Sequence, residues 1–383
     1  MILESIQAHH FRNLSGELSL GPRLNVILGN NGQGKTNWLE AVYLLSRTKS
    51  FRTQRLQEGI KFGQETGFVR GQVTRGVELR RDLQVTIQGN TKTISINGKR
   101  EPLARYLGQL QVFSFTAAEL EVVRGVPEAR RRFIDRGVAS LHPSYVQTIA
   151  DYSRVIKQKN RILQDANEQG LSLLQVEDLV SPWNQQIVGL ACEIHEARTA
   201  YIKSINEVLE RGLFEQRDVH IDYVSSLAGK GDLSDYKSLV SQRLQLRIQA
   251  ELAASRSLIG PHRDDLEVLL EGREMRVFGS SGQQRSALLL LDLAAISLYN
   301  SRHGDYPLFL IDDVDAELDE RRIRHLLEYL ESRTQTFITT SKRTHIEDFL
   351  SRANVYEIAD GAVLTSQQKD PPATEVLAPV ETV

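Results

Sequence analysis

The stretch Gly29–Thr36, GNNGQGKT, constrains this chain more than any other, because it matches the pattern GxxxxGK(S/T). The apolar run Leu24–Leu28 before it predicts a buried strand, and Asn37–Leu45 after it predicts a helix. Backbone N–H groups of such a loop can surround phosphate, and the helix N-terminus adds positive potential. We therefore predict that a nucleotide binds to Gly29, Asn30, Asn31, Gly32, Gln33, Gly34, Lys35 and Thr36.

A second apolar run, Leu308–Ile311, ends in two carboxylates, Asp312 and Asp313. A buried strand that carries an aspartate to a phosphate loop is the arrangement that holds Mg²⁺ in nucleotide-hydrolysing proteins. We predict that Thr36 offers its hydroxyl to Mg²⁺ and that Asp312 holds the ion through water. We predict catalytic roles for Lys35, which neutralises phosphate charge, and for Asp313, which orients or deprotonates the attacking water.

Residues Ser280–Arg285, SSGQQR, stand directly before an apolar helical run that ends at Tyr299. One capping residue is enough to begin a helix, so this segment carries more polar groups than a cap requires. Serine hydroxyls, a glycine N–H and a helix N-terminus together offer an anion site. We therefore expect Ser280, Ser281, Gly282 and Gln283 to bind a ligand.

The first hundred residues have the pattern of an α/β protein with many strands. Strands are expected over Gly67–Val73, Leu83–Gln88 and Lys92–Asn97. The dipeptide Gly89-Asn90 predicts a hairpin turn between the last two.

The middle of the chain has a helical pattern. Between Pro143 and Gly212, apolar residues recur in steps of three and four, and Gln169–Pro182 separates them into two segments. We expect an antiparallel helical hairpin that forms a packed lobe. The expected division is an α/β head in two parts, 1–120 and 251–365, an inserted helical lobe, 121–250, and a disordered tail, 366–383.

The composition argues against several classes of protein. Lys and Arg number 47 and Asp and Glu 49, so a nucleic-acid surface would have to be local. The single cysteine, Cys192, excludes an intramolecular disulfide framework and favours a reducing compartment. No run is long enough to span a bilayer, and the first residues lack the apolar core of a signal peptide. We expect a cytoplasmic protein without a membrane partner.

The order of these motifs resembles the ABC ATPase family: a phosphate loop, SSGQQ, the strand that ends in Asp312, and Ala316–Asp319 (AELD). In that family the stretch at Ser280 would be the signature, which caps a γ-phosphate held by the phosphate loop of a partner subunit. More than half of the chain separates the two motifs. This spacing is similar to that of chromosome-maintenance and double-strand-break-repair ATPases. The resemblance implies an ABC-type P-loop ATPase head, a mixed sheet with flanking helices, and an inserted helical-hairpin lobe.

Further stretches are similar to the RecF family of bacterial recombination mediators: His10–Leu14, Ser50–Thr53, Glu119–Asp135, Gly260–Leu266 and Leu310–Arg322. The resemblance implies an ATP- and Mg²⁺-dependent homodimer that clamps DNA near single-strand gaps with little sequence preference. It adds Arg12 to the nucleotide-binding residues, and the short Asp313 side chain implies slow, DNA-stimulated hydrolysis. It also implies RecR and RecO as partners, loading of the RecA recombinase, and roles in replication restart, recombinational repair and the SOS response.

The chain departs from these families at two places near the expected site. Phe115–Glu119, FTAAE, stands where the RecF family carries Ser-Pro-Glu-Asp, and Gln111 is the candidate for the glutamine that contacts Mg²⁺ in ABC proteins. Thr339–Ser341 stands where transporters carry a switch histidine, which argues against the energising subunit of a membrane transporter. That subunit, and a DNA scaffold that binds ATP without hydrolysing it, are the alternative functions.

Three groups of basic residues are candidates for DNA contact. Each group taken alone is more typical of a solvated helix face, and the RecF resemblance implies that at least one of them lines a DNA track. Contacts of this kind go mainly to phosphates and carry little sequence information. The groups are Arg130, Arg131, Arg132 and Arg136; Arg154, Lys157, Lys159 and Arg161; and Arg321, Arg322 and Arg324.

Overall fold

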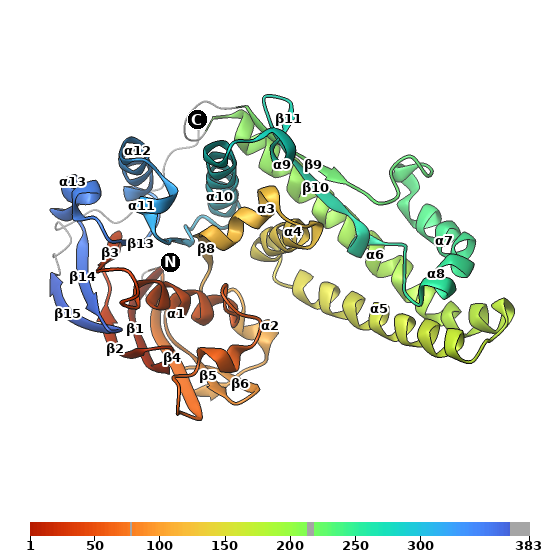
Figure 1. The fold of residues 1–383 in the computed structure, drawn as a ribbon, viewed down its shortest axis with the longest axis horizontal. Helices are drawn as coiled ribbons and strands as arrows, with labels where there is room; N and C mark the ends of the chain where they lie inside the picture. Colours follow the sequence, from red (N-terminus) through yellow and green to blue (C-terminus); the bar gives the residue numbers. More distant parts are fainter. Residues whose placement is uncertain (77–78, 213–217, 368–383) are drawn as a thin grey trace. The chain divides into compact units, whose positions relative to one another are not determined.

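The chain forms two compact units (Figure 1). The computed structural model describes three stretches, residues 1–76, 79–212 and 218–367. The first unit contains Met1–Leu120 and the described residues from Ser280 onward. The second contains Glu121–Arg211 and residues 218–279. Strand β15 (Ala362–Gln367) includes the first two residues of the expected tail, and the rest of that tail lies outside the described residues.

An antiparallel sheet, ordered β2-β1-β4-β5-β6-β7, forms one layer of the first unit. Its strands are β1 (Ile2–Phe11), β2 (Leu14–Ser19), β4 (Thr66–Arg75), β5 (Leu79–Gln88), β6 (Thr91–Ile96) and β7 (Lys99–Arg100). The three predicted strands are confirmed as β4, β5 and β6, and Gly89 and Asn90 form the turn of the β5–β6 hairpin. Alternate residues of β4 and β5 are buried, so one face of this sheet covers a core.

A second, mostly parallel sheet carries both the phosphate loop and the acidic strand. Its order is β15-β14-β3-β13-β12-β8, with β15 antiparallel at the edge. The other strands are β3 (Leu24–Leu28), β8 (Val112–Phe115), β12 (Leu308–Ile311), β13 (Thr336–Thr340) and β14 (Asn354–Ala359). Because β3, β13, β12 and β8 run parallel, their carboxyl ends meet at one edge, where ligands bind in sheets of this kind.

Helix α1 (Lys35–Arg47) lies between the two sheets, because it contacts β4 and β5 of the first and β8 and β13 of the second. Trp38 and Leu44 of α1 are fully buried in the core that the sheets share. The long apolar helix predicted after the SSGQQ stretch is α10 (Ser281–His303), which contacts β8. The other helical segments of this unit are η1 (Leu56–Gly59), α2 (Leu103–Tyr106), η2 (Ala117–Leu120), α11 (Val314–Glu317), α12 (Glu320–Glu331), η5 (Arg343–Ile346) and α13 (Glu347–Leu350).

The second unit is built on a helical hairpin, α5 (Tyr145–Glu168) and α6 (Leu173–Glu210), which pack along each other (Figure 1). The predicted interruption at Gln169–Pro182 is too long, because α6 continues through Pro182. Proline removes one backbone hydrogen bond from a helix, but Val180 and Ile187 are buried on either side of it, and this packing keeps the helix continuous. None of the helices in the described stretches is long and apolar enough to cross a membrane.

Shorter elements complete the second unit. Its helical segments are α3 (Glu121–Arg124), α4 (Pro127–Leu141), η3 (Leu233–Asp235), α7 (Tyr236–Leu246), α8 (Ile248–Ala254), η4 (Pro261–Arg263) and α9 (Met275–Phe278). Its strands, in the order β11-β10-β9, are β9 (Val219–Val224), β10 (Asp265–Leu270) and β11 (Arg273–Glu274).

Residues 251–279 belong to this second unit and not to the head in which they were expected. Strand β10 pairs antiparallel with β9 along its whole length. The carboxylate of Asp265 accepts hydrogen bonds from Nε and Nη2 of Arg130 in α4, and the carbonyl of Pro261 accepts one from Arg198 in α6. The local sequence pattern does not reveal these long-range contacts. For this reason the predicted boundary between lobe and head, at residue 251, was wrong.

An ion pair between α5 and α8 is completely buried in the second unit. Lys159 Nζ lies 2.5 Å from a carboxylate oxygen of Glu251, and neither side chain is exposed. The other carboxylate oxygen accepts the N–H of Leu258 at 2.7 Å. Burial lowers the pKa of Lys159, and the attraction of Glu251 opposes that shift. Lys159 is therefore a structural residue, and its candidacy for DNA contact is wrong.

The variant Lys159→Met should lower the free energy of unfolding by about 3–5 kcal/mol, because it leaves Glu251 as an unpaired buried carboxylate. The control Lys157→Met, at an exposed position of the same helix, should change it by less than about 0.5 kcal/mol. Adding Glu251→Leu to the first variant should recover part of the loss. Urea unfolding followed by circular dichroism measures all three proteins. Equal stabilities for the two single variants would contradict the buried-pair interpretation.

Candidate functional site

The phosphate loop leaves the carboxyl end of β3 and enters α1 through two glycines in the left-handed region, Gly32 (φ 81°) and Gly34 (φ 99°). A Cβ at Gly34 would lie 2.9 Å from Asn13 Oδ1 and 3.1 Å from the Cα of Gly361. Glycine is therefore required at this position by both its φ angle and the available space.

Lys35 begins α1 and reaches back across the loop. Its Nζ donates hydrogen bonds to the carbonyl oxygens of Gly29 (2.7 Å) and Asn30 (3.0 Å). Burial lowers the pKa of Lys35, and the charges of Asp313 and Asp312 oppose that shift. The loop lysine and both aspartates of the acidic strand therefore lie close together, as expected for an apolar strand that carries an aspartate to a phosphate loop.

Asp312 is held by two threonine hydroxyls, one from the start of α1 and one from the end of β13. Oδ1 of Asp312 accepts hydrogen bonds from Thr36 Oγ1 (2.9 Å) and from Thr339 Oγ1 (2.7 Å). Burial raises the pKa of Asp312, and these two hydrogen bonds oppose the shift. Mg²⁺ prefers oxygen ligands, so the adjacent Thr36 hydroxyl and Asp312 carboxylate are groups that fit this ion.

Asp313 has a strained backbone that Thr339 holds in place. Its φ of 47° lies in the left-handed region, which costs energy for a residue with a side chain. The N–H of Asp313 donates to Thr339 Oγ1 at 2.6 Å, so one buried hydroxyl binds both aspartates. The sequence interpretation noted Thr339 only as a replacement for a histidine. Its one local signal is its place near the end of β13, a buried strand in which three of the five residues are threonine.

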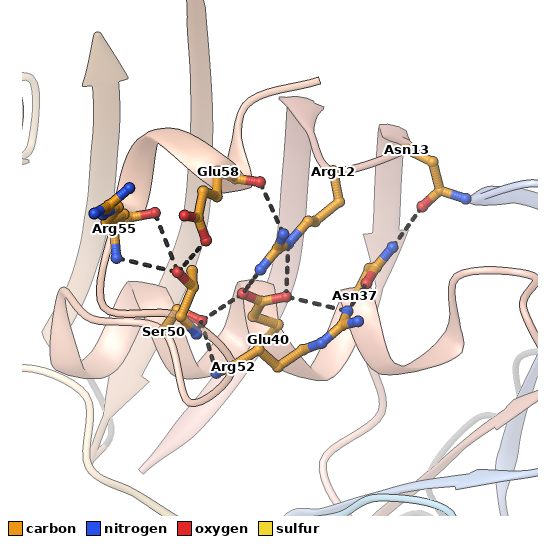
Figure 2. Close-up of polar contacts among 9 residues, drawn as sticks. Arg12, Asn13, Asn37, Glu40, Ser50, Arg52, Arg55 and Glu58 are labelled. Carbon is orange, nitrogen blue, oxygen red and sulfur yellow. Dashed lines mark hydrogen bonds and ion pairs between the residues drawn. The ribbon is translucent and has the colours of Figure 1, made fainter. Parts of the chain in front are cut away.

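Arg12, at the end of β1, lies beside the site with its guanidinium bound to Glu40 of α1 (Figure 2). Arg12 Nε and Nη2 donate to the two oxygens of Glu40 at 3.0 and 2.8 Å, and Nη1 donates to the carbonyl of Glu58. The Glu40 side chain has no solvent exposure, and it also accepts a hydrogen bond from Ser50 Oγ. Burying a carboxylate is costly, and the three hydrogen bonds donated to Glu40 offset that cost.

Arg52 is a cation of the same cluster that the sequence interpretation did not assign. Its Nη1 donates to Asn37 Oδ1 at 2.7 Å and lies 3.6 Å from Glu40 (Figure 2). The Arg52 side chain is 46 % exposed, so part of the guanidinium faces the solvent of the cavity. Its only sequence signal is its place in the Ser50–Thr53 stretch.

These groups line one cavity of about 1510 Å³ within the first unit. Of the predicted residues, the lining includes Arg12, Asn31, Gly32, Gly34, Lys35, Thr36, Asp312 and Asp313. The predicted residues Gly29, Asn30 and Gln33 do not line it. The side chain of Gln33 instead accepts the N–H of Asp360 at 2.8 Å.

The SSGQQ stretch begins α10 and lies outside this cavity. Ser280 Oγ accepts the N–H of Gln283 at 3.3 Å, and the Gln283 side chain accepts the N–H of Ser280 at 2.9 Å. This reciprocal pair is a capping box, so two of the four predicted phosphate-binding residues cap the helix. Ser281 is exposed and Gly282 is partly exposed, which leaves both accessible to another molecule.

Gln111 was the candidate for the glutamine that contacts Mg²⁺. It lies at the end of β8 away from Asp312, so this prediction is wrong. Its carbonyl accepts the N–H of Leu308 where β8 and β12 begin, whereas Asp312 donates its N–H to Phe115 at the opposite end. Ala117, which follows β8, lines the cavity instead. The register of the parallel pair β8 and β12 decides which end of β8 lies beside Asp312, and this register cannot be read from the sequence.

Most of the basic residues considered for DNA contact are bound to carboxylates. The ion pairs are Arg130–Asp265, Arg132–Glu128, Arg154–Asp151, Arg161–Asp165, Arg322–Asp319 and Arg324–Asp348. Exposed pairs of this kind are weak, so phosphate can replace the carboxylate. Arg130 differs because its side chain is 3 % exposed, which excludes it from a DNA surface.

Comparison with known proteins matches residues 2–363 to the family described as RecF/RecN/SMC N terminal domain. The DNA replication and repair protein RecF of Listeria welshimeri is 34% identical over 382 residues, covering 96% of this chain and 100% of the relative. The protein of the same name from Staphylococcus epidermidis is 33% identical over 377 residues, covering 95% and 100%.

Solved structures agree with these sequence relatives. A structure of the recombination mediator protein RecF-ATP in the RecFOR pathway superposes with a TM-score of 0.86 at 28% identity, covering 96% of this chain and 97% of the other. An SMC head bound to the C-winged helix domain of ScpA has a TM-score of 0.56 at 14% identity, covering 96% and 98%, and it supports the fold alone. The sequence and the fold thus match those of RecF proteins along almost the whole chain. The chain belongs to the RecF family and has the mixed α/β fold of an ABC-type ATPase head.

Proposed function

We propose that this protein is an ATP-dependent DNA-binding repair protein whose two copies close around shared nucleotides. One observation carries the proposal. The phosphate loop and the acidic strand share a cavity, whereas the exposed start of α10 lies outside it. A single chain therefore offers a nearly complete nucleotide site and a second phosphate-binding element that its own site does not use.

At the nucleotide site, the chain's own residues would bind ATP and orient water. Lys35 and the free N–H groups at the start of α1 bind the phosphates. Arg52 is a second cation in the lining of the same cavity. Bound at Thr36 and Asp312, Mg²⁺ would neutralise charge on the β- and γ-phosphates. Asp313 orients the attacking water, and its short carboxylate keeps hydrolysis slow.

Dimerisation would follow from the same chemistry. Ser281, Gly282 and the N-terminus of α10 bind the γ-phosphate in the partner's cavity, so ATP is held more tightly by the dimer than by the monomer. A ligand stabilises the state that it prefers, and ATP therefore drives assembly.

The biological role that we propose comes from the family. The dimer clamps duplex DNA near single-strand gaps through phosphate contacts, and hydrolysis releases it. With RecR and RecO as partners, it helps to load the RecA recombinase in the cytoplasm. Replication restart, recombinational repair and the SOS response are the processes that depend on this step.

Two variants separate nucleotide binding from assembly. Lys35→Met should abolish ATP binding, because the loop loses the charge that faces the phosphates. Ser281→Arg should leave ATP binding by the monomer intact and abolish ATP-driven dimerisation, because a bulky cation replaces the exposed hydroxyl. Equilibrium binding of a fluorescent ATP analogue and light scattering measure the two properties. Normal ATP-driven dimerisation by the Ser281→Arg protein would refute the assembly model.

Thr339→Val should lower kcat by about tenfold or more with a smaller change in KM, since losing a hydrogen bond to a charged group costs roughly 1.5–3 kcal/mol. It should also speed hydrogen exchange at the Asp313 amide, which loses its acceptor. Thr339→Ser keeps the hydroxyl and should behave as wild type. Thr336→Val, a buried position at the start of the same strand, is the matched control. Equal kcat values for the two valine variants would exclude a positioning role for Thr339.

DNA binding should depend strongly on salt and weakly on sequence. Six phosphate contacts would reduce the affinity roughly 10³-fold between about 50 and about 200 mM salt, because each contact releases counterions. Titrations with several unrelated duplexes of equal length, in the presence of ATP, measure both properties. A sequence-selective complex that is insensitive to salt would contradict the proposal.

A further inference from the structure

The turn between β14 and β15 lies directly against the phosphate loop, although the two are far apart in the sequence. The two strands pair antiparallel with Ala359 opposite Ala362, so Asp360 and Gly361 form a two-residue hairpin turn. Their φ angles are 47° and 77°, both in the left-handed region. Two successive left-handed residues define a type I′ turn, for which Asp-Gly is a preferred sequence. The local sequence therefore gives this turn a defined shape.

Gln33 of the phosphate loop binds the turn through both its side chain and its backbone. Its side-chain oxygen accepts the N–H of Asp360, and its carbonyl accepts the N–H of Gly361, each at 2.8 Å. Gln33 stands between Gly32 and Gly34, which are both left-handed, so the loop restrains itself little at this point. The two hydrogen bonds therefore fix the most permissive part of the loop.

The direction of the Gln33 carbonyl matters for the ligand. A loop that binds phosphate needs its N–H groups toward the anion, and a carbonyl oxygen there would repel it. The hydrogen bond from Gly361 directs the Gln33 carbonyl to the turn. The turn thus keeps this oxygen from facing the phosphates.

The turn is held from a second side by α1. The carbonyl of Gly361 accepts a hydrogen bond from Nε1 of the buried Trp38 at 3.3 Å. The space around Gly361 is tight, because a Cβ there would lie 2.5 Å from the carbonyl oxygen of Asn13. On the other side, a Cβ at Gly34 would lie 3.1 Å from the Cα of Gly361. The turn and the loop therefore pack backbone against backbone, which only glycine allows.

We propose that the Asp360-Gly361 turn positions the phosphate loop for the nucleotide, and that Gln33 is the positioning residue through which it acts. Gln33 does not line the cavity, so its side chain serves the turn and not the ligand. Nucleotide binding and docking of the β14–β15 turn are then coupled, and each stabilises the other by the same free energy. The proposal rests on the proposed binding of ATP to the loop.

Two variants weaken this contact from its two sides. Gln33→Leu removes the acceptor of the Asp360 N–H and should weaken Mg·ATP binding about two- to tenfold, as expected for one lost hydrogen bond. Gly361→Ala places a Cβ against Asn13 and should weaken binding about tenfold or more, because the turn has to move away from the loop. At saturating Mg·ATP, kcat should change by less than about twofold in both variants, because the bound ligand restores the docked loop. Calorimetric titration and ATPase assays measure these values.

Gly98→Ala is the matched control. Asn97 and Gly98 form a left-handed turn of the same kind between β6 and β7, with φ angles of 51° and 75°. A Cβ at Gly98 would meet no atom within 4 Å. This variant has the backbone strain of Gly361→Ala without its steric contact, so it should bind Mg·ATP as wild type does. Urea unfolding checks that both alanine variants are folded.

Hydrogen exchange at the turn tests the coupling in the other direction. Saturating Mg·ATP should slow exchange at the amides of Asp360 and Gly361 in the wild-type protein, because both amides donate to the loop. The amide of Arg333, which donates to the carbonyl of Leu330 at the end of α12, should not respond. In Gln33→Leu without nucleotide, the Asp360 amide should exchange faster than in wild type.

Unchanged Mg·ATP affinity in both Gln33→Leu and folded Gly361→Ala would overturn the proposal. An equal loss in Gly98→Ala would overturn it as well, because backbone strain alone would then account for the effect. Exchange at Asp360 and Gly361 that does not respond to Mg·ATP would exclude the coupling. Wild-type protein that does not bind Mg·ATP would refute the proposed function itself.

Discussion

The parallel pairing of β3, β13 and β12 is the constraint on which the site depends. It brings together Thr36, Asp312 and Thr339, which come from three distant parts of the sequence. Two threonine hydroxyls then converge on one oxygen of Asp312, and the same Thr339 hydroxyl accepts the strained amide of Asp313. Any change in the register of these strands would separate the phosphate loop from its carboxylates.

The helix between the two sheets adds a second constraint. Helix α1 begins at the loop lysine and carries Glu40 into a position without solvent, where Arg12 and Arg52 must neutralise it. The antiparallel sheet supplies Arg12, and the turn after α1 supplies Arg52. The buried carboxylate therefore joins the antiparallel sheet to α1 and holds two cations beside the space where phosphates are proposed to bind.

Local patterns predicted the elements well and the long-range contacts poorly. The strand before the loop, the three strands of the antiparallel sheet and the apolar helix α10 were all evident from periodicity. Pro182 was a misleading signal, because tertiary packing outweighed the lost hydrogen bond. Lys159 and Arg130 looked like solvated cations, since a run of basic residues does not reveal that Glu251 and Asp265 lie opposite them.

The sequence by itself determined the chemistry of this protein: a glycine-rich loop that needs left-handed backbone, a lysine and a threonine at a helix start, an apolar strand that ends in aspartates, and a second helix start rich in serine. These signals are local, because each depends on the spacing of a few neighbouring residues. Only the tertiary structure decided which groups share a cavity. It excluded Gln111 and the start of α10 from that cavity and added Thr339 and Arg52. The physical reason is that strand register and burial depend on contacts between residues far apart in the chain.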